Sequence, residues 1–377
     1  MNHKKTAERI LKIAAALGLL YLFLLSITMM GASFKMFGKG FAEGLIKSCS
    51  HPFAGLFIGI LATSLVQSSS TVTSLVVGFV GGGMLPLPYG IPIIMGANIG
   101  TSITNTLVSL SFVARKEDFR RAFAGATVHD FFNLCTVAVF FPLELAFNLI
   151  ERMAIVLTGL FEGVGGAQFT SPLKALMKPS VHAIEWVLQE GLRLSDTVTA
   201  VIMLILALAV LIGSLVFLVR VMRSLIVAKA ETFIDRFLFR NDLVALLLGL
   251  GLTVAVQSSS VTTSLIVPLV GAGIVSLYRC YPFTLGANLG TTCTALLASL
   301  ATVTMVQGEA NTVGVTTAFA HLAFNLCGIA LFYPLRALPI KLASMLADLA
   351  AESKRWAALF VVGVFFVLPL MVVLLTR

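Results

Sequence analysis

The stretch TSLVQSSSTVTSL, residues 63–75, places a glutamine and three serines in the middle of a long apolar segment. A second copy, TVAVQSSSVTTSL, occupies residues 253–265, so that the two motifs lie 190 residues apart. Side chains that form strong hydrogen bonds are costly to bury among apolar neighbours unless they find partners. The presence of the motif twice in one chain therefore points to a specific role.

The composition indicates that these motifs belong to a membrane protein. Of the 377 residues, 58% are hydrophobic and 11% are charged, whereas charged residues make up about a quarter of a soluble chain. About 20 apolar residues are needed for a helix to cross a bilayer. Stretches of about this length or more lie at residues 13–34, 89–113, 121–150, 197–219, 281–306, 312–335 and 357–376.

Two further stretches, residues 52–86 and 242–276, are too long for one crossing and hold QSSS near the middle. A half of roughly 15 residues forms a helix of only about 22 Å, which is shorter than the roughly 30 Å hydrocarbon core. We therefore expect two re-entrant helical hairpins. Their polar turns should lie near the middle of the membrane and be buried in protein, because irregular backbone is not tolerated against lipid.

Positive charge predicts the orientation of the chain. With the N-terminus in the cytoplasm, most of the 26 Lys and Arg residues fall on the cytoplasmic side, as the positive-inside rule requires. Membrane topology then accounts for most of the net charge of +9. No nucleic-acid partner is needed to explain that charge.

The chain contains a duplicated unit. GANIGTSIT at 96–104 matches GANLGTTCT at 286–294, and HDFFNLCTVAVFFPL at 129–143 matches HLAFNLCGIALFYPL at 321–335. We expect each unit to comprise a first helix, a hairpin, a helix broken at GAN and a third helix. Because this makes an odd number of crossings, the second unit would be inverted. Inverted repeats are typical of secondary transporters, which bind substrate and ions near midplane where the repeats meet.

We therefore predict an all-α membrane protein built of four parts; an ancient duplication in another kind of membrane protein is the alternative. The parts are transmembrane repeat 1 at 1–150, with hairpin 52–86 and broken helix 89–113; an extracytoplasmic loop at 151–196; inverted repeat 2 at 197–336, with hairpin 242–276 and broken helix 281–306; and a cytoplasmic linker with a C-terminal transmembrane helix at 337–377.

The expected hairpin turns are suited to binding ions. Where one half-helix ends and the next begins, free carbonyl groups attract cations and free amide groups attract anions. Ser70, Thr73 and Ser74 would share one face of the second half-helix, and the other copy repeats this pattern. In the alternative interpretation, the serines only cap a helix or bond a neighbouring helix.

The GANxGT motifs offer a second source of polar groups. Two glycines around an asparagine are expected to break the helix, and Thr101 and Thr104, like Thr291 and Thr294, lie one turn apart. The alternative is a glycine kink that serves helix packing. Because no Lys or Arg lies in either turn or break, a bound anion would depend on hydroxyls, amides and nearby sodium ions.

The third helix of each unit contains a polar pair one turn apart: His129 with Asn133, and His321 with Asn325. We expect these pairs to form hydrogen bonds between helices, and a place in the transport pathway is the second interpretation.

Asp130 has no acidic counterpart, because Leu322 stands at its place in the second unit. An acid within a transmembrane helix indicates a function. Three roles stay open for it: a sodium ligand, a proton carrier, or the ion-pair partner of an Arg or His.

At these residues the chain resembles the type II sodium-phosphate cotransporter family. The resemblance extends from about 52 to 336 and rests on the two QSSS motifs, the GANxGT motif after each, and RRAFAGATVHDFFNL at 120–134. It implies uptake of inorganic phosphate, as HPO₄²⁻, driven by sodium through alternating access. The chain departs from the animal members by its short tails and by an external loop without cysteines or an N-x-S/T site. It therefore looks bacterial in size, and we expect a multi-pass protein of the bacterial inner membrane.

The resemblance also implies roles for single residues. It places Ser68 and Ser69 with Gln257, Ser258 and Thr294 around sodium and phosphate. From the duplication itself we expect the two turns to face each other across a few ångströms near midplane. Asp130 matches an acid found in the charge-moving members of the family, so transport is expected to be electrogenic.

The predicted site consists of two overlapping sets of residues. Phosphate is expected at Ser68, Ser69, Ser70, Ser258, Ser259, Ser260, Asn98 and Asn288, and sodium at Gln67, Ser68, Ser69, Thr104, Asp130, Gln257, Ser258 and Thr294. Na⁺ is the expected coupling ion, with no transition metal and no organic cofactor. The expected partners are phosphate and the lipid bilayer, and a homodimer is left open.

The chain is not expected to be an enzyme, and two alternatives to phosphate transport remain. One is a Na⁺-coupled transporter of another oxyanion or small solute on the same fold. The more distant one is an intramembrane serine hydrolase with His129 or His321 as base, for which the usual GxSxG motif is missing.

Overall fold

The structure is a computed structural model that describes residues 2–37, 51–162, 172–237, 241–306 and 309–376. Its α-helices are α1 (Asn2–Phe37), α3 (Pro52–Val66), α4 (Ser69–Gly81), α5 (Leu87–Gly100), α6 (Ile103–Ser109), α7 (Lys116–Phe147), α8 (Leu149–Phe161), α9 (Pro172–Trp186), α10 (Asp196–Phe237), α11 (Asp242–Val256), α12 (Ser259–Gly271), α13 (Leu277–Leu300), α14 (Val313–Phe332), α15 (Ala337–Glu352), α16 (Lys354–Val362) and α17 (Leu368–Leu375). Shorter helical turns lie at Leu110–Phe112, Val187–Gly191 and Gly363–Val367. Strands β1 (Thr304–Val306) and β2 (Glu309–Asn311) pair antiparallel, with Thr304 opposite Asn311.

Seven helical segments of the described chain are long and apolar enough to cross a membrane. They are Thr6–Phe37, Leu87–Phe112, Lys116–Phe147, Asp196–Met222, Leu277–Leu300, Val313–Phe332 and Lys354–Leu375. Each overlaps one of the seven single spans expected from the sequence. The prediction of an all-α membrane protein is confirmed at this level, and the small β1–β2 pair is an addition to it.

The two QSSS segments each form a pair of short helices. Helices α3 and α4 have 15 and 13 residues, and α11 and α12 have the same two lengths. At about 1.5 Å per residue, none of the four reaches the roughly 30 Å needed to cross the hydrocarbon core. The second helix of each pair is followed by a glycine with positive φ, Gly83 or Gly273, which lets the chain turn into the next long helix.

The predicted breaks at GAN are wrong in position for the first unit and wrong altogether for the second. In the first unit the helix continues through Asn98 and is interrupted at Thr101 and Ser102, between α5 and α6. In the second unit α13 runs without interruption for 24 residues, through Asn288.

The glycines of these motifs serve close helix packing, which explains why the helix does not break there. A Cβ atom at Gly96 would collide with the carbonyl oxygen of Leu56 in α3, and one at Gly286 with that of Leu246 in α11. The first helix of each hairpin therefore packs backbone to backbone against the long helix that follows, as small residues allow in membrane proteins.

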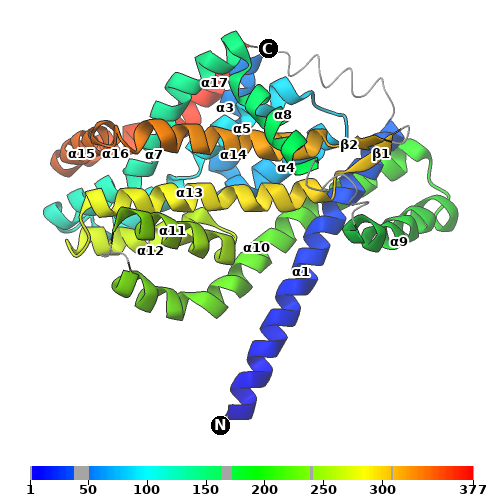
Figure 1. The fold of residues 1–377 in the computed structure, drawn as a ribbon, viewed down its shortest axis with the longest axis horizontal. Coiled ribbons are helices and arrows are strands. Elements are labelled where there is room, and N and C mark those ends of the chain that lie inside the picture. Colours follow the sequence, from blue (N-terminus) through cyan, green and yellow to red (C-terminus); the bar gives the residue numbers. More distant parts are fainter. Residues whose placement is uncertain (1, 38–50, 163–171, 238–240, 307–308, 377) are drawn as a thin grey trace.

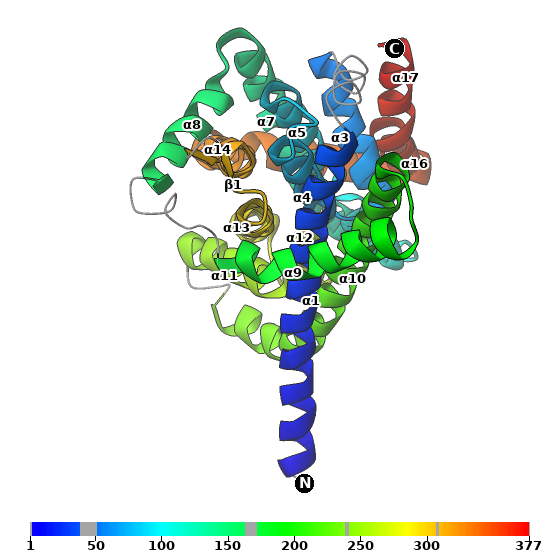
Figure 2. The same ribbon diagram turned by 90° about the vertical axis from the view of Figure 1, so that its right-hand side faces the viewer.

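The second hairpin helix of each unit packs against the other unit. Helix α4 contacts α13 and α14, whereas α12 contacts α6 and α7. Helices α13 and α14 run side by side along the long axis in Figure 1 and are seen end-on in Figure 2. Helices α1 and α10 pack along one another, and the N-terminal half of α1 projects from the body in both views. The two units are thus interlocked.

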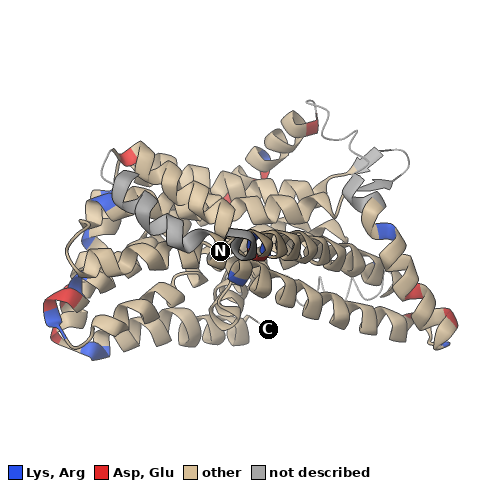
Figure 3. Cartoon of the chain, turned by 90° about the horizontal axis from the view of Figure 1, so that it is seen from below, with Lys and Arg blue, Asp and Glu red and all other residues tan. Residues whose placement is uncertain are grey.

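Among the described residues, Lys, Arg, Asp and Glu lie mainly toward the two ends of the long axis (Figure 3). At one end the linker expected at 337–356 forms α15, an ordered helix. Its buried alanines, among them Ala347 and Ala350, pack against Phe119 and Phe123 of α7. The segment expected as an extracytoplasmic loop at 151–196 is largely helical in its described parts, as α8 and α9.

Candidate functional site

Each QSSS motif forms the tight turn between two short helices. The glutamine adopts the left-handed conformation in both copies, with φ of 58° at Gln67 and 61° at Gln257. The next serine caps the second helix: Ser68 Oγ accepts the N–H of Thr71 at 3.2 Å, and Ser258 makes the matching bond in the other copy. The capping role considered for these serines is therefore confirmed for the first serine of each motif.

One side-chain hydrogen bond ties each turn to the helical segment that follows the hairpin, to α6 in the first unit and to α13 in the second. Thr104 Oγ1 donates to Gln67 Oε1 at 2.9 Å, and Thr294 Oγ1 donates to Gln257 Oε1 at 2.9 Å. The Gln–Thr pairs predicted as sodium ligands are therefore brought together in each unit. Both pairs present side-chain oxygen atoms, which are the ligands that hard cations prefer.

The second turn also reaches into the first unit. Ser260 Oγ donates to the carbonyl oxygen of Thr101 at 3.3 Å. Because Thr104 lies one helical turn beyond Thr101 and bonds Gln67, both turns contact the same short segment, residues 101–104. No hydrogen bond joins the two turns directly within the described residues, so their predicted face-to-face contact stays a prediction.

The two turns differ in their exposure. The middle serines, Ser69 and Ser259, are only 3% and 2% exposed. Gln67 is exposed, as is Leu65 before it, whereas Gln257 is half-buried. Beside Gln257 lies an apolar cavity of about 320 Å³ between α1, α10 and α11. The first turn is thus the more accessible of the two.

A buried cluster of asparagines connects the two units at the centre of the molecule. Asn288 Nδ2 lies 3.0 Å from Asn133 Oδ1 and 3.1 Å from Asn325 Oδ1. Asn98 Nδ2 lies 3.2 Å from the same oxygen of Asn325, and His321 Nε2 lies 3.0 Å from Asn98 Oδ1. The predicted interhelical role of the His and Asn pairs is confirmed. The phosphate role of Asn98 and Asn288 stays a prediction, since their amides are already engaged with neighbours.

Asp130 is fully buried on α7, and neither carboxylate oxygen has a hydrogen-bond partner in the described chain. Ser102, in the break between α5 and α6, is its polar neighbour and also bonds His129 at 3.4 Å. No Arg, Lys or His of the described residues forms an ion pair with Asp130. The ion-pair interpretation therefore finds no support, whereas a role in binding a cation or a proton stays open.

Two threonines that the sequence did not single out lie next to the glutamines of the QSSS turns. Thr63 and Thr253 are buried, and their hydroxyl groups have no hydrogen-bond partner among the described residues. Their carbonyl oxygens accept the N–H groups of Gln67 and Gln257. The signal was present in the duplication, because each threonine stands four residues before its glutamine.

The comparison of this chain with sequence families agrees with the geometry. The profile of the family described as Na⁺/Pi-cotransporter matches residues 22–164 and 210–367. The chain belongs to this cotransporter family. The matched segments include both QSSS turns, the 101–104 segment and Asp130, so the residues brought together in the structure lie inside the family's own region.

Animal relatives of the Na⁺/Pi-cotransporter family are similar over nearly the whole chain. Sodium-dependent phosphate transport protein 2B of Homo sapiens is 34% identical over 94% of this chain and 64% of its own length, and the Pongo abelii protein of that name gives the same shares. Protein 2A of Rattus norvegicus is 36% identical over 98% of this chain and 68% of its own length. The chain thus spans slightly less than two thirds of the 2B proteins. No solved structure matches it.

Proposed function

We propose that this protein is a secondary active symporter that couples Na⁺ entry to the uptake of inorganic phosphate. The family and its relatives are named for sodium-dependent phosphate transport. The observation that supports the proposal most strongly is the convergence of both QSSS turns on residues 101–104. A duplicated pair of turns that meet at one segment fits a single binding site with a wall from each unit.

The proposed arrangement in the membrane follows from the helix lengths. Helices α3 with α4, and α11 with α12, would form re-entrant hairpins, and the two units would run in opposite directions through the bilayer. The end of the molecule that includes Arg115, Arg120 and Arg279 would face the cytoplasm, as would the N-terminus. We place the protein in the bacterial inner membrane.

Sodium would bind at the Gln–Thr pairs. At each turn the first short helix ends, so its terminal carbonyl groups attract a cation. The side-chain oxygens of Gln67 with Thr104, and of Gln257 with Thr294, lie at these same ends. The buried hydroxyls of Thr63 and Thr253 offer additional oxygen ligands close to the glutamines.

Phosphate would bind between the N-termini of α4 and α12, where amide groups and serine hydroxyls donate hydrogen bonds. The proposed ligands are Ser68, Ser69 and Ser70 with Ser258, Ser259 and Ser260; Asn98 and Asn288 would join them only by exchanging their present partners. Because this region has no Lys or Arg, adjacent sodium ions would supply the positive charge that a divalent anion needs. Coupling then follows from mutual electrostatic stabilisation.

Asp130 would serve as a further sodium ligand, which makes transport electrogenic. Its carboxylate is buried without a hydrogen-bond partner in the described chain, and burial of an unpaired charge is costly. A cation bound beside it removes that cost. Alternating access would expose the site to each side of the membrane in turn, through movement of one unit against the other.

The test is uptake of radiolabelled phosphate by the purified protein in proteoliposomes at clamped membrane potential. We expect uptake that requires an inward sodium gradient and fails when potassium replaces sodium. Uptake independent of sodium would contradict the proposal. Competition by sulfate at equal concentration tests the alternative substrate class: inhibition of phosphate uptake by sulfate would favour a transporter of another oxyanion on the same fold.

A further inference from the structure

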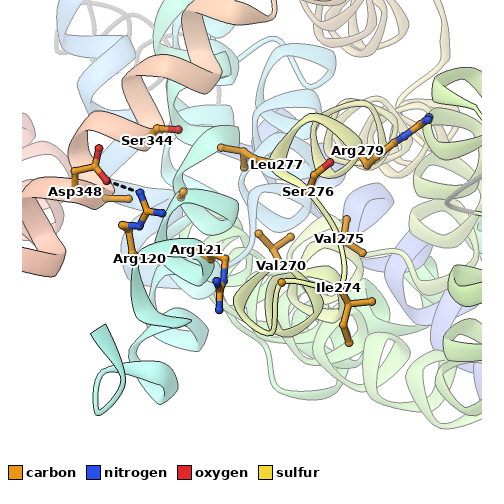
Figure 4. A pocket seen from close by; sticks show the side chains of 13 residues that line it. Arg120, Arg121, Val270, Ile274, Val275, Ser276, Leu277, Arg279, Ser344 and Asp348 are labelled. Atoms are coloured by element: carbon orange, nitrogen blue, oxygen red, sulfur yellow. Dashed lines mark hydrogen bonds and ion pairs between the residues drawn. The ribbon is translucent and has the colours of Figure 1, made fainter. Parts of the chain in front are cut away.

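A cavity of about 440 Å³, shown in Figure 4, lies at the end of α12 that is opposite to the second QSSS turn. It is formed by α7, α15 and the connection from α12 to α13. Helix α12 leads from the second turn to this connection over 13 residues, a distance of about 20 Å. The cavity is therefore separate from the proposed transport site.

Three arginines line this cavity: Arg120 and Arg121 from α7, and Arg279 from α13. Asp348 is the acidic residue that lines it, and Ser276 and Ser344 add hydroxyl groups. The lining thus holds more positive than negative charge. In Figure 4 the two α7 arginines lie on one side, and Arg279 lies on the other side with its guanidinium group directed away from them, where it bonds Asp242.

The arginines retain hydrogen-bond donors for a ligand. Arg121 is held in place by bonds from Nε to the Gly271 carbonyl at 3.0 Å and from a terminal nitrogen to Asp118 at 2.7 Å. Arg279 uses one terminal nitrogen to bond Asp242. A guanidinium group has five N–H donors, so both side chains have donors left over.

Arg120 is the arginine whose present partners are most easily replaced. It pairs with Glu117 at 3.2 Å and with Asp348 at 3.0 Å, and these acids are 63% and 55% exposed. Exposed ion pairs contribute little stability. An incoming dianion or monoanion can therefore displace Asp348 at small cost.

We propose that this cavity binds a phosphate group, supplied by the headgroup of an anionic lipid or by free inorganic phosphate. Planar guanidinium groups match phosphate oxygens in pairs of hydrogen bonds. Basic pockets between helices at the membrane surface attract anionic headgroups. Ile274 in the lining and Tyr278 next to it are 58% and 52% exposed, and they offer apolar contact to the adjoining part of a lipid.

A bound phosphate group would connect α7, α13 and α15 at the base of the second hairpin. It should therefore raise the thermal stability of the protein and slow movement of that hairpin relative to α7. Removal of one arginine near an anionic surface weakens binding by about fivefold, and removal of the competing acid should strengthen it.

The experiment uses the full chain in nanodiscs, in sodium-free buffer, with thermal midpoint and native mass spectrometry as readouts. One arm adds phosphatidylglycerol to a phosphatidylcholine disc without phosphate in the buffer. The other arm adds inorganic phosphate, with sulfate as comparison, to a pure phosphatidylcholine disc. A response in the first arm identifies a lipid headgroup, and a response in the second identifies free phosphate.

Three variants decide the outcome. We expect about fivefold weaker binding in Arg120→Gln, stronger binding in Asp348→Asn, and no change in Arg355→Gln, an exposed arginine at the same end that does not line the cavity. Opposite shifts in the first two variants cannot arise from a general loss of folding. Absence of a response in both arms, or equal weakening in Arg120→Gln and Arg355→Gln, would overturn the proposal.

Discussion

At the scale of single residues, the repeated feature is a glutamine in the left-handed conformation whose side-chain oxygen accepts a threonine hydroxyl. The geometry is the same in both copies, down to the 2.9 Å distance from Thr104 to Gln67 and from Thr294 to Gln257. A left-handed glutamine is strained relative to glycine. Retention of the side chain at this cost, in both copies, indicates that its oxygen has a function.

Replacement of Thr104 or Thr294 by valine tests this function at nearly constant side-chain volume. The change removes the hydroxyl that bonds the glutamine, so the sodium concentration for half-maximal uptake should rise about fivefold, as expected for one lost hydrogen bond. The measurement is the sodium dependence of phosphate uptake in proteoliposomes. Thr127→Val is the matched control, because that hydroxyl bonds its own helix at Phe123; an equal rise there would contradict the assignment.

The role of Asp130 can be tested by a single substitution. In Asp130→Asn the charge moved per phosphate should fall, because the proposed sodium ligand loses its negative charge, and the sodium stoichiometry should fall with it. Simultaneous recording of current and tracer uptake measures both. Glu190→Gln, which changes an exposed acid, serves as control. Unchanged charge per phosphate in Asp130→Asn would exclude Asp130 as the charge-moving ligand.

At the scale of helices, the decisive contacts are backbone to backbone. Helices α5 and α13 approach the first hairpin helices so closely that only glycine fits at Gly96 and Gly286. In the second unit this contact holds the same helix that carries Thr294 and so positions that proposed sodium ligand; in the first unit Thr104 lies on α6, beyond the break that follows α5.

A methyl group at this contact should therefore destabilise the fold. We expect Gly286→Ala to lower the free energy of unfolding by about 1–3 kcal/mol, the usual cost of overpacking. The thermal midpoint in detergent measures the loss. Gly213→Ala is the control, because a Cβ there meets no atom and alanine favours the helix. Equal stability of Gly286→Ala and the wild-type protein would contradict the close packing.

Ion pairs stabilise the start of the second hairpin. Asp242, at the start of α11 and outside the seven candidate spans, pairs with Arg336 and with Arg279. The hydrogen bond from Arg336 is the main reason that the pKa of Asp242 lies below its usual value of 3.8. A carboxyl with a lowered pKa in the folded state stabilises the protein above its unfolded pKa, and this contribution is lost as the pH falls through the folded value.

Asp242→Asn should accordingly lower the thermal midpoint at pH 7, and the gap to the wild-type protein should narrow as the pH falls below about 4. A pH series of melting curves measures this. Glu8→Gln, which breaks an exposed pair with Lys12, should cause a smaller change at every pH. If the difference in thermal midpoint between Asp242→Asn and the wild-type protein stayed constant down to the lowest pH of the series, the charge of Asp242 would not be the cause of that difference.

At the scale of the whole molecule, the sequence predicts the seven spans and the two paired short helices well, because apolar length and internal repetition are local properties. It fails where tertiary packing decides. Gly96 and Gly286 suggested helix breaks, but the neighbouring backbone makes them packing sites. The contact of Ser260 with Thr101 joins residues 159 positions apart, and no pattern within one unit could reveal it.

The linker before the last span illustrates the same limit. The sequence of this linker does not indicate which helix its alanines contact, yet Ala347 and Ala350 are fully buried against α7. The arginine-lined cavity beside them likewise arises from three segments distant in sequence. The sequence shows that these alanines and arginines are present. Only the fold shows which of them pack against one another or line the same cavity.

Both QSSS turns are proposed to bind one phosphate together with its sodium ions. An experimental density map of the protein in sodium phosphate, from cryo-electron microscopy with a bound antibody fragment, tests this proposal most directly. We predict one phosphate in contact with serines of both turns, Ser68–Ser70 and Ser258–Ser260, and sodium beside Gln67 and Gln257. Phosphate bound to one turn alone, or two separate phosphates at turns too far apart to share a ligand, would contradict the account.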